Sequence, residues 1–170
     1  MQKIIDLIGK AYRGVTKSLN LLHSPLLLAI RLYWGWQFAS DGLAKLQHLD
    51  HVTQFFLSLN IPAAGFAALM VALVELIGGI LFALGIASRL TALILFVNMT
   101  MAYLSVPDDR AAFLHLVTAP DKFIAADPFA YWFAALLILI LGPGIFAVDW
   151  LIARRFAPHS NPPKKQEAGA

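Results

Sequence analysis

Four long apolar stretches, separated by shorter polar segments, constrain this chain more than any other feature of its sequence. They run over residues 25–46, 63–87, 90–106 and 129–148. Each reaches or approaches the roughly 20 residues that an α-helix needs to cross the ~30 Å hydrocarbon core of a bilayer. Because 59% of the 170 residues are hydrophobic and only 14% are charged, a soluble fold of this size could not bury the apolar surface. The sequence therefore predicts an all-α integral membrane four-helix bundle.

Proline and glycine mark the ends of these stretches. Pro25 and Pro62 suit the first turns of the first and second helices. Ser88 and Arg89 leave room only for a short turn between the second and third helices, which predicts an antiparallel hairpin. Gly142-Pro143-Gly144 predicts a kink or break in the fourth helix.

The remaining segments differ from the four stretches in composition. Residues 1–22 carry apolar side chains at helical spacing among three lysines and one arginine, which predicts a basic amphipathic helix on the membrane surface. Residues 47–61 and 107–128 are expected to be partly helical and to lie on the bilayer surface. Residues 157–170 are rich in proline, lysine and small residues, and we expect a mobile cytoplasmic tail.

The distribution of lysine and arginine predicts the orientation. These residues cluster before the first helix, at the turn between the second and third, and after the fourth. Lys45, Arg110 and Lys122 are the basic residues on the opposite side. The positive-inside rule therefore predicts that both termini are cytoplasmic. Basic residues spread in this way indicate membrane topology and not a nucleic-acid surface, so the expected partners are the lipid bilayer and other membrane subunits.

Several polar side chains fall inside the predicted membrane helices, where an unpaired charge costs about 2.5–3.5 kcal/mol. At ~1.5 Å per residue, Gln37 and Glu75 lie about 18 Å from the ends of their helices, Asn98 roughly 13 Å and Arg31 about 9 Å. We expect a Glu75–Arg31 ion pair, with Gln37 and Asn98 filling the spare hydrogen bonds. Asp41 is a further charge that needs a partner.

The helix faces support a protein-facing position for Glu75. One face of the first helix carries Arg31, Gly35, Phe38, Gly42 and Lys45. The matching face of the second helix carries small residues around the carboxylate, namely Ala64, Ala68, Ala72, Gly79 and Ala83. Small residues let membrane helices approach closely. Glu75 should therefore face protein.

Two interpretations of this polar cluster remain open. The cluster can be structural, fixing the register of the helices, or it can be a proton or quinone-headgroup site. No catalytic residue is assigned. His48 and His51 could share a helix face, but no third ligand has suitable spacing, so no metal site is predicted. The absence of cysteine excludes thiol–disulfide exchange and iron–sulfur ligation on this chain.

Arg31, Gly35, Gly42 and Lys45 on the first helix are followed by Glu75, Gly78, Gly79 and Arg89. This ordered pattern resembles the DoxX family of small four-helix membrane proteins. The resemblance covers roughly residues 25–106 and continues less distinctly to residue 150. Asn60 stands where the family usually has glycine, and asparagine tolerates the left-handed conformation.

The resemblance implies a link to membrane redox complexes, because the family takes its name from the small subunit of a thiosulfate:quinone oxidoreductase. It offers no secure catalytic assignment for the matching positions. Relatives that use disulfide chemistry need cysteines, which this chain lacks. The implied location is a bacterial or archaeal cytoplasmic membrane.

Three functions fit the sequence. The first is a membrane-embedded subunit that supports a larger, quinone-linked redox complex, with quinone as its possible cofactor. The second is a purely structural accessory subunit of another membrane assembly. The third is a small transporter or a proton path through Glu75. A chain without cofactor ligands is not expected to be a complete oxidoreductase alone.

Overall fold

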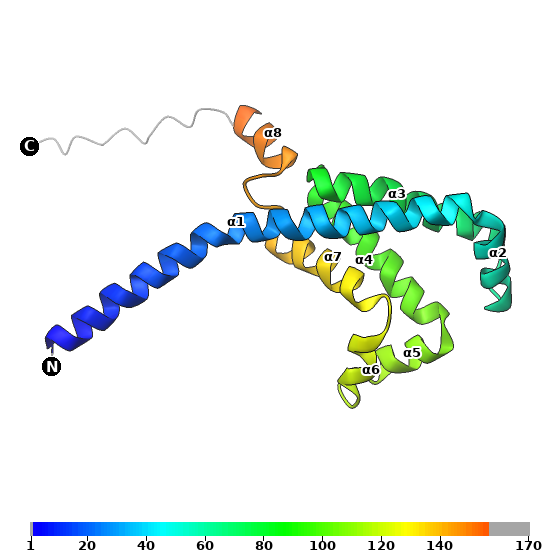
Figure 1. The fold of residues 1–170 in the computed structure, drawn as a ribbon, viewed down its shortest axis with the longest axis horizontal. Coiled ribbons are helices and arrows are strands. Elements are labelled where there is room, and N and C mark those ends of the chain that lie inside the picture. Colours follow the sequence, from blue (N-terminus) through cyan, green and yellow to red (C-terminus); the bar gives the residue numbers. More distant parts are fainter. Residues whose placement is uncertain (1, 157–170) are drawn as a thin grey trace, which may run out of the picture.

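A computed structural model describes residues 2–156, with side chains over residues 22–155. Within that range the chain forms eight α-helices and no strand (Figure 1), which confirms the all-α prediction. Residues 157–170, and with them the predicted tail, lie outside the described residues. The helices are α1 (Gln2–Gln47), α2 (Leu49–Ser58), α3 (Ala64–Leu84), α4 (Ser88–Ser105), α5 (Pro107–Leu114), α6 (Pro120–Ala125), α7 (Phe129–Leu141) and α8 (Val148–Phe156).

Helix α1 joins two segments that the sequence predicted as separate helices. It is one helix of 46 residues with Pro25 inside it, so the expected helix start at Pro25 is wrong. Proline lacks the N–H that would bond the carbonyl four residues earlier, and its ring crowds that carbonyl. Figure 1 shows a bend in the blue part of α1. The surface location of residues 1–22 stays a prediction.

Helices α3 and α4 form the apolar hairpin that the sequence predicted, but Ser88 and Arg89, where the turn was expected, are the first two residues of α4. Both helices are long and apolar enough to cross a membrane. Residues 85–87 connect them, and two of these have left-handed backbone, Gly85 (φ 71°) and Ala87 (φ 45°). Asn60, before α3, is also left-handed (φ 56°), as the sequence led us to expect.

The fourth apolar stretch is shorter than predicted. Helix α7 has 13 residues and ends at Leu141, where the sequence placed a helix to residue 148. Gly142 at its end has φ 82°, and proline at 143 cannot continue the hydrogen-bond ladder. The break that Gly142-Pro143-Gly144 predicted is therefore confirmed, and α8 follows after residues 142–147.

The two longer connections are partly helical, as predicted. Residues 47–61 contain α2, and residues 107–128 contain α5 and α6. An aromatic cluster holds α5 and α6 against the ends of α4 and α7, and the Tyr103 hydroxyl donates a hydrogen bond to the Phe123 carbonyl at 2.9 Å. Its rings belong to Tyr103, Phe113, Phe123, Phe129 and Trp132.

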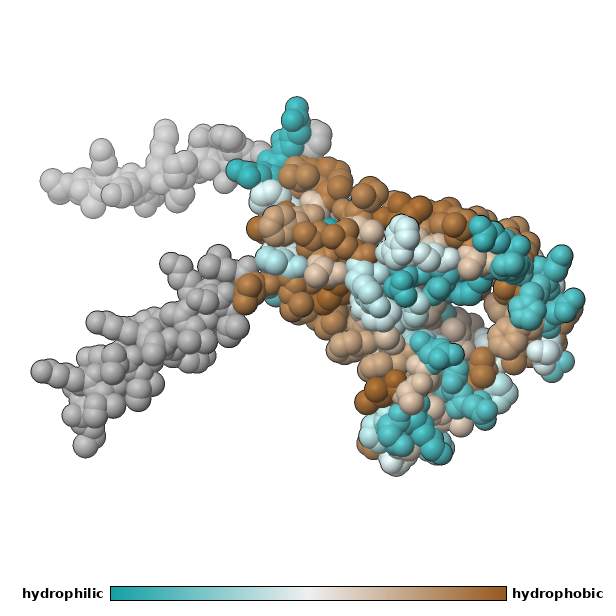
Figure 2. All heavy atoms as spheres, viewed as in Figure 1, coloured by the Kyte–Doolittle hydropathy of each residue, from teal (hydrophilic) through white to brown (hydrophobic). Residues whose placement is uncertain are grey.

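The long helices pack around a shared apolar core. Helix α1 contacts α3, α3 contacts α4, α4 contacts α7, and α7 contacts α1. In Figure 2, hydrophobic residues run along α3 and over the part of the face nearer α8, paler and hydrophilic residues lie over the middle of α1, and hydrophilic residues gather over α2, α5 and α6 and at α8. The buried core residues are Leu27, Phe38, Phe82, Ala92, Leu95, Met99, Ala135 and Ile138.

Glycines bring the backbones of α1 and α3 into direct contact, as the small-residue face predicted. A Cβ added to Gly79 would lie 2.5 Å from the backbone nitrogen of Ala39, and one added to Gly35 would lie 2.8 Å from that of Ala83. Gly42 lies equally close to the backbone of α3. Gly78 instead faces α4, where an added Cβ would meet the side chain of Leu95 at 2.9 Å.

This contact predicts the effect of adding one methyl group to α3. Gly79→Ala should lower the free energy of unfolding by about 1–3 kcal/mol, because the crowded atoms are backbone and cannot rotate away. Gly65→Ala is the matched control, since the nearest atom to its added Cβ is 3.8 Å away. Thermal unfolding in detergent measures both variants. Equal stability of the two would contradict the close α1–α3 contact.

Candidate functional site

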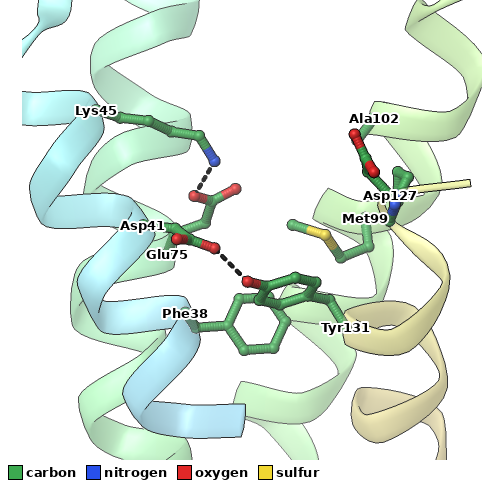
Figure 3. Close-up of a pocket in the computed structure, with 9 residues that line it drawn as sticks. Phe38, Asp41, Lys45, Glu75, Met99, Ala102, Asp127 and Tyr131 are labelled. Atoms are coloured by element: carbon green, nitrogen blue, oxygen red, sulfur yellow. Dashed lines mark hydrogen bonds and ion pairs between the residues drawn. The ribbon is translucent and has the colours of Figure 1, made fainter.

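A buried carboxylate lies where α1, α3 and α4 meet. Glu75 on α3 is 2% exposed and forms an ion pair with the ammonium of Lys45 on α1 (Figure 3). The amide of Asn98 on α4 donates a hydrogen bond to Glu75 Oε1 at 3.2 Å. We call Lys45, Glu75 and Asn98 the polar centre. Three helices therefore supply one charged or polar group each.

The helix faces explain how these groups meet. Glu75 lies on the buried face of α3, between Ala72 and Gly79. Lys45 follows Gly42 by one helical turn on α1, and the close helix contact at Gly42 brings its side chain alongside α3. The Lys45 side chain stays 33% exposed, so the lysine links the buried carboxylate to the end of the molecule where α2 lies.

The predicted Glu75–Arg31 pair is not formed. Arg31 lies beside Ala83, and its Nη2 is 3.4 Å from the Ala83 carbonyl oxygen. Ala83 and Glu75 are eight residues apart on α3, about 12 Å along the helix, which is too far for this pair. Gln37 is half-buried, and among the described side chains it makes no hydrogen bond to Glu75. Of the four residues expected at the centre, the structure brings together Glu75 and Asn98.

Arg31 has a structural role at the opposite end of α3. Its side chain is 1% exposed, and it donates hydrogen bonds to the carbonyl oxygens of Pro143 (2.6 Å) and Phe146 (3.1 Å). These carbonyls belong to the irregular segment after α7. Backbone polar groups that have no helical partner need other hydrogen-bond partners when they are buried. Arg31 therefore holds residues 142–147 in place.

Asp149 completes this end of the molecule. Its two carboxylate oxygens accept hydrogen bonds from the backbone N–H groups of Ala87 and Ser88, both at 2.7 Å, at the start of α4. Burial alone would raise the pKa of the Asp149 carboxyl. The N–H groups of Ser88 and Ala87 and the charge of Arg31 outweigh that effect and hold the pKa below its ordinary value. Arg89, in the first turn of α4, is exposed.

A second polar pair lies next to the polar centre. The hydroxyl of Tyr131 on α7 donates a hydrogen bond to Asp41 Oδ2 on α1 at 2.5 Å. Figure 3 shows the Asp41 carboxylate directed at Tyr131, with Lys45 and Glu75 facing each other above it. The sequence marked Asp41 as a charge in need of a partner. It gave no signal for Tyr131, because the rotation of α7 about its axis depends on packing.

Two cavities share Lys45, Glu75 and Ala102 as lining residues. The smaller has a volume of about 200 Å³, and we call it the acidic cavity because Asp41, Asp127 and Tyr131 also line it. The larger has a volume of about 470 Å³, within the range of small-molecule sites. We call it the apolar cavity, and its lining includes Phe55, Phe56, Leu59, Met70, Val71, Asn98 and Met101.

Comparison with known proteins places the chain in a family. Residues 26–108 match the family described as DoxX. Over 118 residues the chain is 30% identical to "Putative oxidoreductase CatD" of Bacillus subtilis (strain 168), across 61% of this chain and 86% of that protein. The chain belongs to the DoxX family. The resemblance that the motif residues carried is thereby confirmed.

The chain is also similar to "Uncharacterized membrane protein Rv3486" of Mycobacterium tuberculosis (strain ATCC 25618 / H37Rv). The two are 36% identical over 87 residues, which is 49% of this chain and 53% of that protein, so this chain spans about half the length of that relative. No solved structure matches the chain. The matched DoxX region contains the whole polar centre, whereas Asp127 and Tyr131 lie beyond it.

The capping role of Asp149 predicts a pH dependence of stability. Because folding lowers the pKa of this carboxyl, its stabilisation is present above the unfolded-state value and is lost as the pH falls through the lower folded-state value. Wild-type protein should therefore lose more stability between about pH 7 and about pH 3 than Asp149→Asn does, by about 1 kcal/mol. Thermal unfolding in detergent at both pH values measures this difference.

The control for this prediction is Asp121→Asn, which changes an exposed carboxylate on α6. That variant should keep the pH dependence of the wild type. An unchanged pH dependence in Asp149→Asn would show that the carboxylate does not stabilise the start of α4.

Proposed function

We propose that this DoxX protein is a membrane-embedded subunit of a quinone-linked redox complex and that its polar centre holds the quinone headgroup. The observation that carries the proposal is the position of Glu75. The carboxylate is 2% exposed, it is bonded to two nitrogen donors on neighbouring helices, and it lines an apolar cavity of about 470 Å³. An ionisable residue inside a membrane domain is, by default, a candidate functional residue.

The proposed topology has four membrane crossings with both termini in the cytoplasm of a bacterial cell. Helices α3 and α4 meet the length and hydropathy of a membrane span, and we add the apolar half of α1 as a third. Helix α7 is about 20 Å long at 13 residues, so residues 142–147 complete the fourth crossing. The basic residues Arg89, Arg154 and Arg155 lie at the α8 end, which supports that end as the cytoplasmic one.

The donors and the cavity lining suit a quinone. Lys45 has three N–H donors and Asn98 has two, so each can donate to a carbonyl oxygen while it keeps its bond to Glu75. Glu75 can accept a proton from a ring hydroxyl. Phe55, Phe56 and nearby methionines supply flat and adaptable apolar surface for a ring. A bound quinone would supply two-electron, two-proton redox chemistry at this position.

A redox role also needs a source of electrons. This chain contains no cysteine, so it has no thiolate to hold an iron–sulfur cluster or to form a redox-active disulfide. We therefore assign electron delivery to a partner subunit. The name of the Bacillus subtilis relative contains the word oxidoreductase, which agrees with this class of function. The exposed apolar side chains of the long helices are available to lipid and to such a partner.

Quinone retention tests the proposal. Wild-type protein extracted in mild detergent should keep a quinone that mass spectrometry detects. Glu75→Gln should lower retention by about tenfold, which corresponds to ~1.4 kcal/mol. Ala67→Phe should do the same by filling the apolar cavity, which Ala67 lines, without removing any group of the polar centre. Asp50→Asn, at an exposed position on α2, is the matched control and should retain quinone as the wild type does.

The two main variants separate a binding site from a structural cluster. If Glu75→Gln lowers only the unfolding temperature and Ala67→Phe retains a full complement of quinone, the polar centre fixes helix register and binds no quinone. Wild-type protein without quinone, even after quinone is added to the detergent, would also contradict the proposal.

A further inference from the structure

We propose that the polar centre exchanges protons with one side of the membrane only, through the acidic cavity, with Asp41 as the relay and Tyr131 as its positioning residue. The assignment of that side as extracytoplasmic rests on the proposed function and topology. The inference that only one side is open does not rest on the proposed function or topology, because it follows from the packing on either side of Glu75.

The acidic cavity connects Glu75 to the end of the molecule at α6 and α7. Its volume of about 200 Å³ is enough for several water molecules at ~30 Å³ each. A water molecule in such a space needs two to four polar partners. The lining provides the carboxylates of Asp41, Glu75 and Asp127 and the hydroxyl of Tyr131. Figure 3 shows Glu75 and Asp41 on one wall of the cavity and Asp127 on the other. Asp127 is exposed and marks the mouth.

The opposite direction is filled with apolar side chains. Phe38, Phe82 and Leu95 are fully buried on the α8 side of Glu75. The rings of Phe38 and Phe82 pack edge to face at 6.2 Å, and Phe38 packs against Tyr131 at 4.9 Å. Arg31 lies beyond this layer and directs its donors at backbone carbonyls. A proton on Glu75 therefore has polar neighbours toward α6 and apolar neighbours toward α8.

The charged and titratable groups that face the acidic cavity come from α1, α3, α7 and the segment before α7. Lys45 and Asp41 face it from α1, Glu75 from α3, Tyr131 from α7, and Asp127 from the segment before α7. With both carboxylates and the ammonium ionised, Asp41, Glu75 and Lys45 carry a net charge of −1. One added proton makes Asp41, Glu75 and Lys45 neutral as a set, and Asp127, which also lines the cavity, lies at its exposed mouth.

The relay involves proton movement alone. A proton leaves the Glu75 carboxyl and protonates a cavity water, which passes a proton to the Asp41 carboxylate. Asp41 then releases its proton to water near Asp127 and returns to the carboxylate form. Only O–H bonds break and form, and no electron moves in these steps. The Tyr131 hydroxyl keeps its own proton and orients Asp41 through its hydrogen bond.

Single-cysteine labelling tests the single open side, and the chain is suited to it because it has no cysteine of its own. A charged, membrane-impermeant thiol reagent is added to either face of reconstituted vesicles. Asp127→Cys at the mouth identifies the face that the cavity opens to. Ala102→Cys, on the cavity wall, should react from that same face only. Leu95→Cys, in the packed layer, should react from neither face.

Two results of the labelling would overturn the inference. Reaction of Ala102→Cys from the face opposite Asp127→Cys would show that water reaches the centre from the other side. Reaction of Leu95→Cys from either face would show that the apolar layer is not closed. Neither result depends on quinone, so failure here is distinguishable from failure of the proposed function.

Time-resolved infrared spectroscopy tests the relay. After rapid acidification of reconstituted, quinone-free protein, the Glu75 carboxylate band should convert to a carboxyl band, with the assignment fixed by its loss in Glu75→Gln. Asp41→Asn should slow this conversion by about a hundredfold, the lower end of what a positioned proton-transfer group contributes. Tyr131→Phe should slow it less, because it removes only the orienting bond. Asp50→Asn should not change the rate, and a wild-type rate in Asp41→Asn would contradict the relay.

Discussion

The ion pair between Glu75 and Lys45 determines how the rest of this molecule is arranged. A carboxylate in the middle of an apolar helix requires a partner of opposite charge, and the partner here comes from the last turn of α1. The pair is compatible with one register of α1 against α3, the register in which Gly42 and Gly79 let the backbones touch. That register also directs Asp41 toward α7, where the Tyr131 hydroxyl donates a hydrogen bond to its carboxylate.

The two ends of the molecule use charge in different ways. At the α8 end, Arg31 and Asp149 form hydrogen bonds with backbone groups. These bonds stabilise the segment after α7 and the start of α4. At the other end, Lys45, Glu75 and Asp41 bond to side chains and line cavities. A layer of buried aromatic and aliphatic side chains separates the two ends. This separation is the reason we assign a structural role to Arg31 and a ligand and proton role to the polar centre.

Much of the fold and two of the three residues of the polar centre, Glu75 and Asn98, could be predicted from the sequence. The lengths of the apolar stretches predicted α3 and α4, and the small-residue face predicted that Glu75 faces protein. Gly142-Pro143-Gly144 predicted the break after α7. The partner of Glu75 could not be predicted, because depth was counted from Pro25 as a helix start, whereas Pro25 lies inside α1. Tyr131 was missed for a different reason, since the rotation and register of α7 are fixed by packing that no local pattern records.

The most direct test of the central claim is a double-mutant cycle on the ion pair, with Lys45→Met, Glu75→Gln and the two combined. Unfolding free energies in detergent should show a coupling of about 1–3 kcal/mol, with the double variant more stable than the sum of the single changes predicts. A coupling near zero would mean that the two charges do not depend on each other, and it would contradict the register, the cavities and the functions assigned to them.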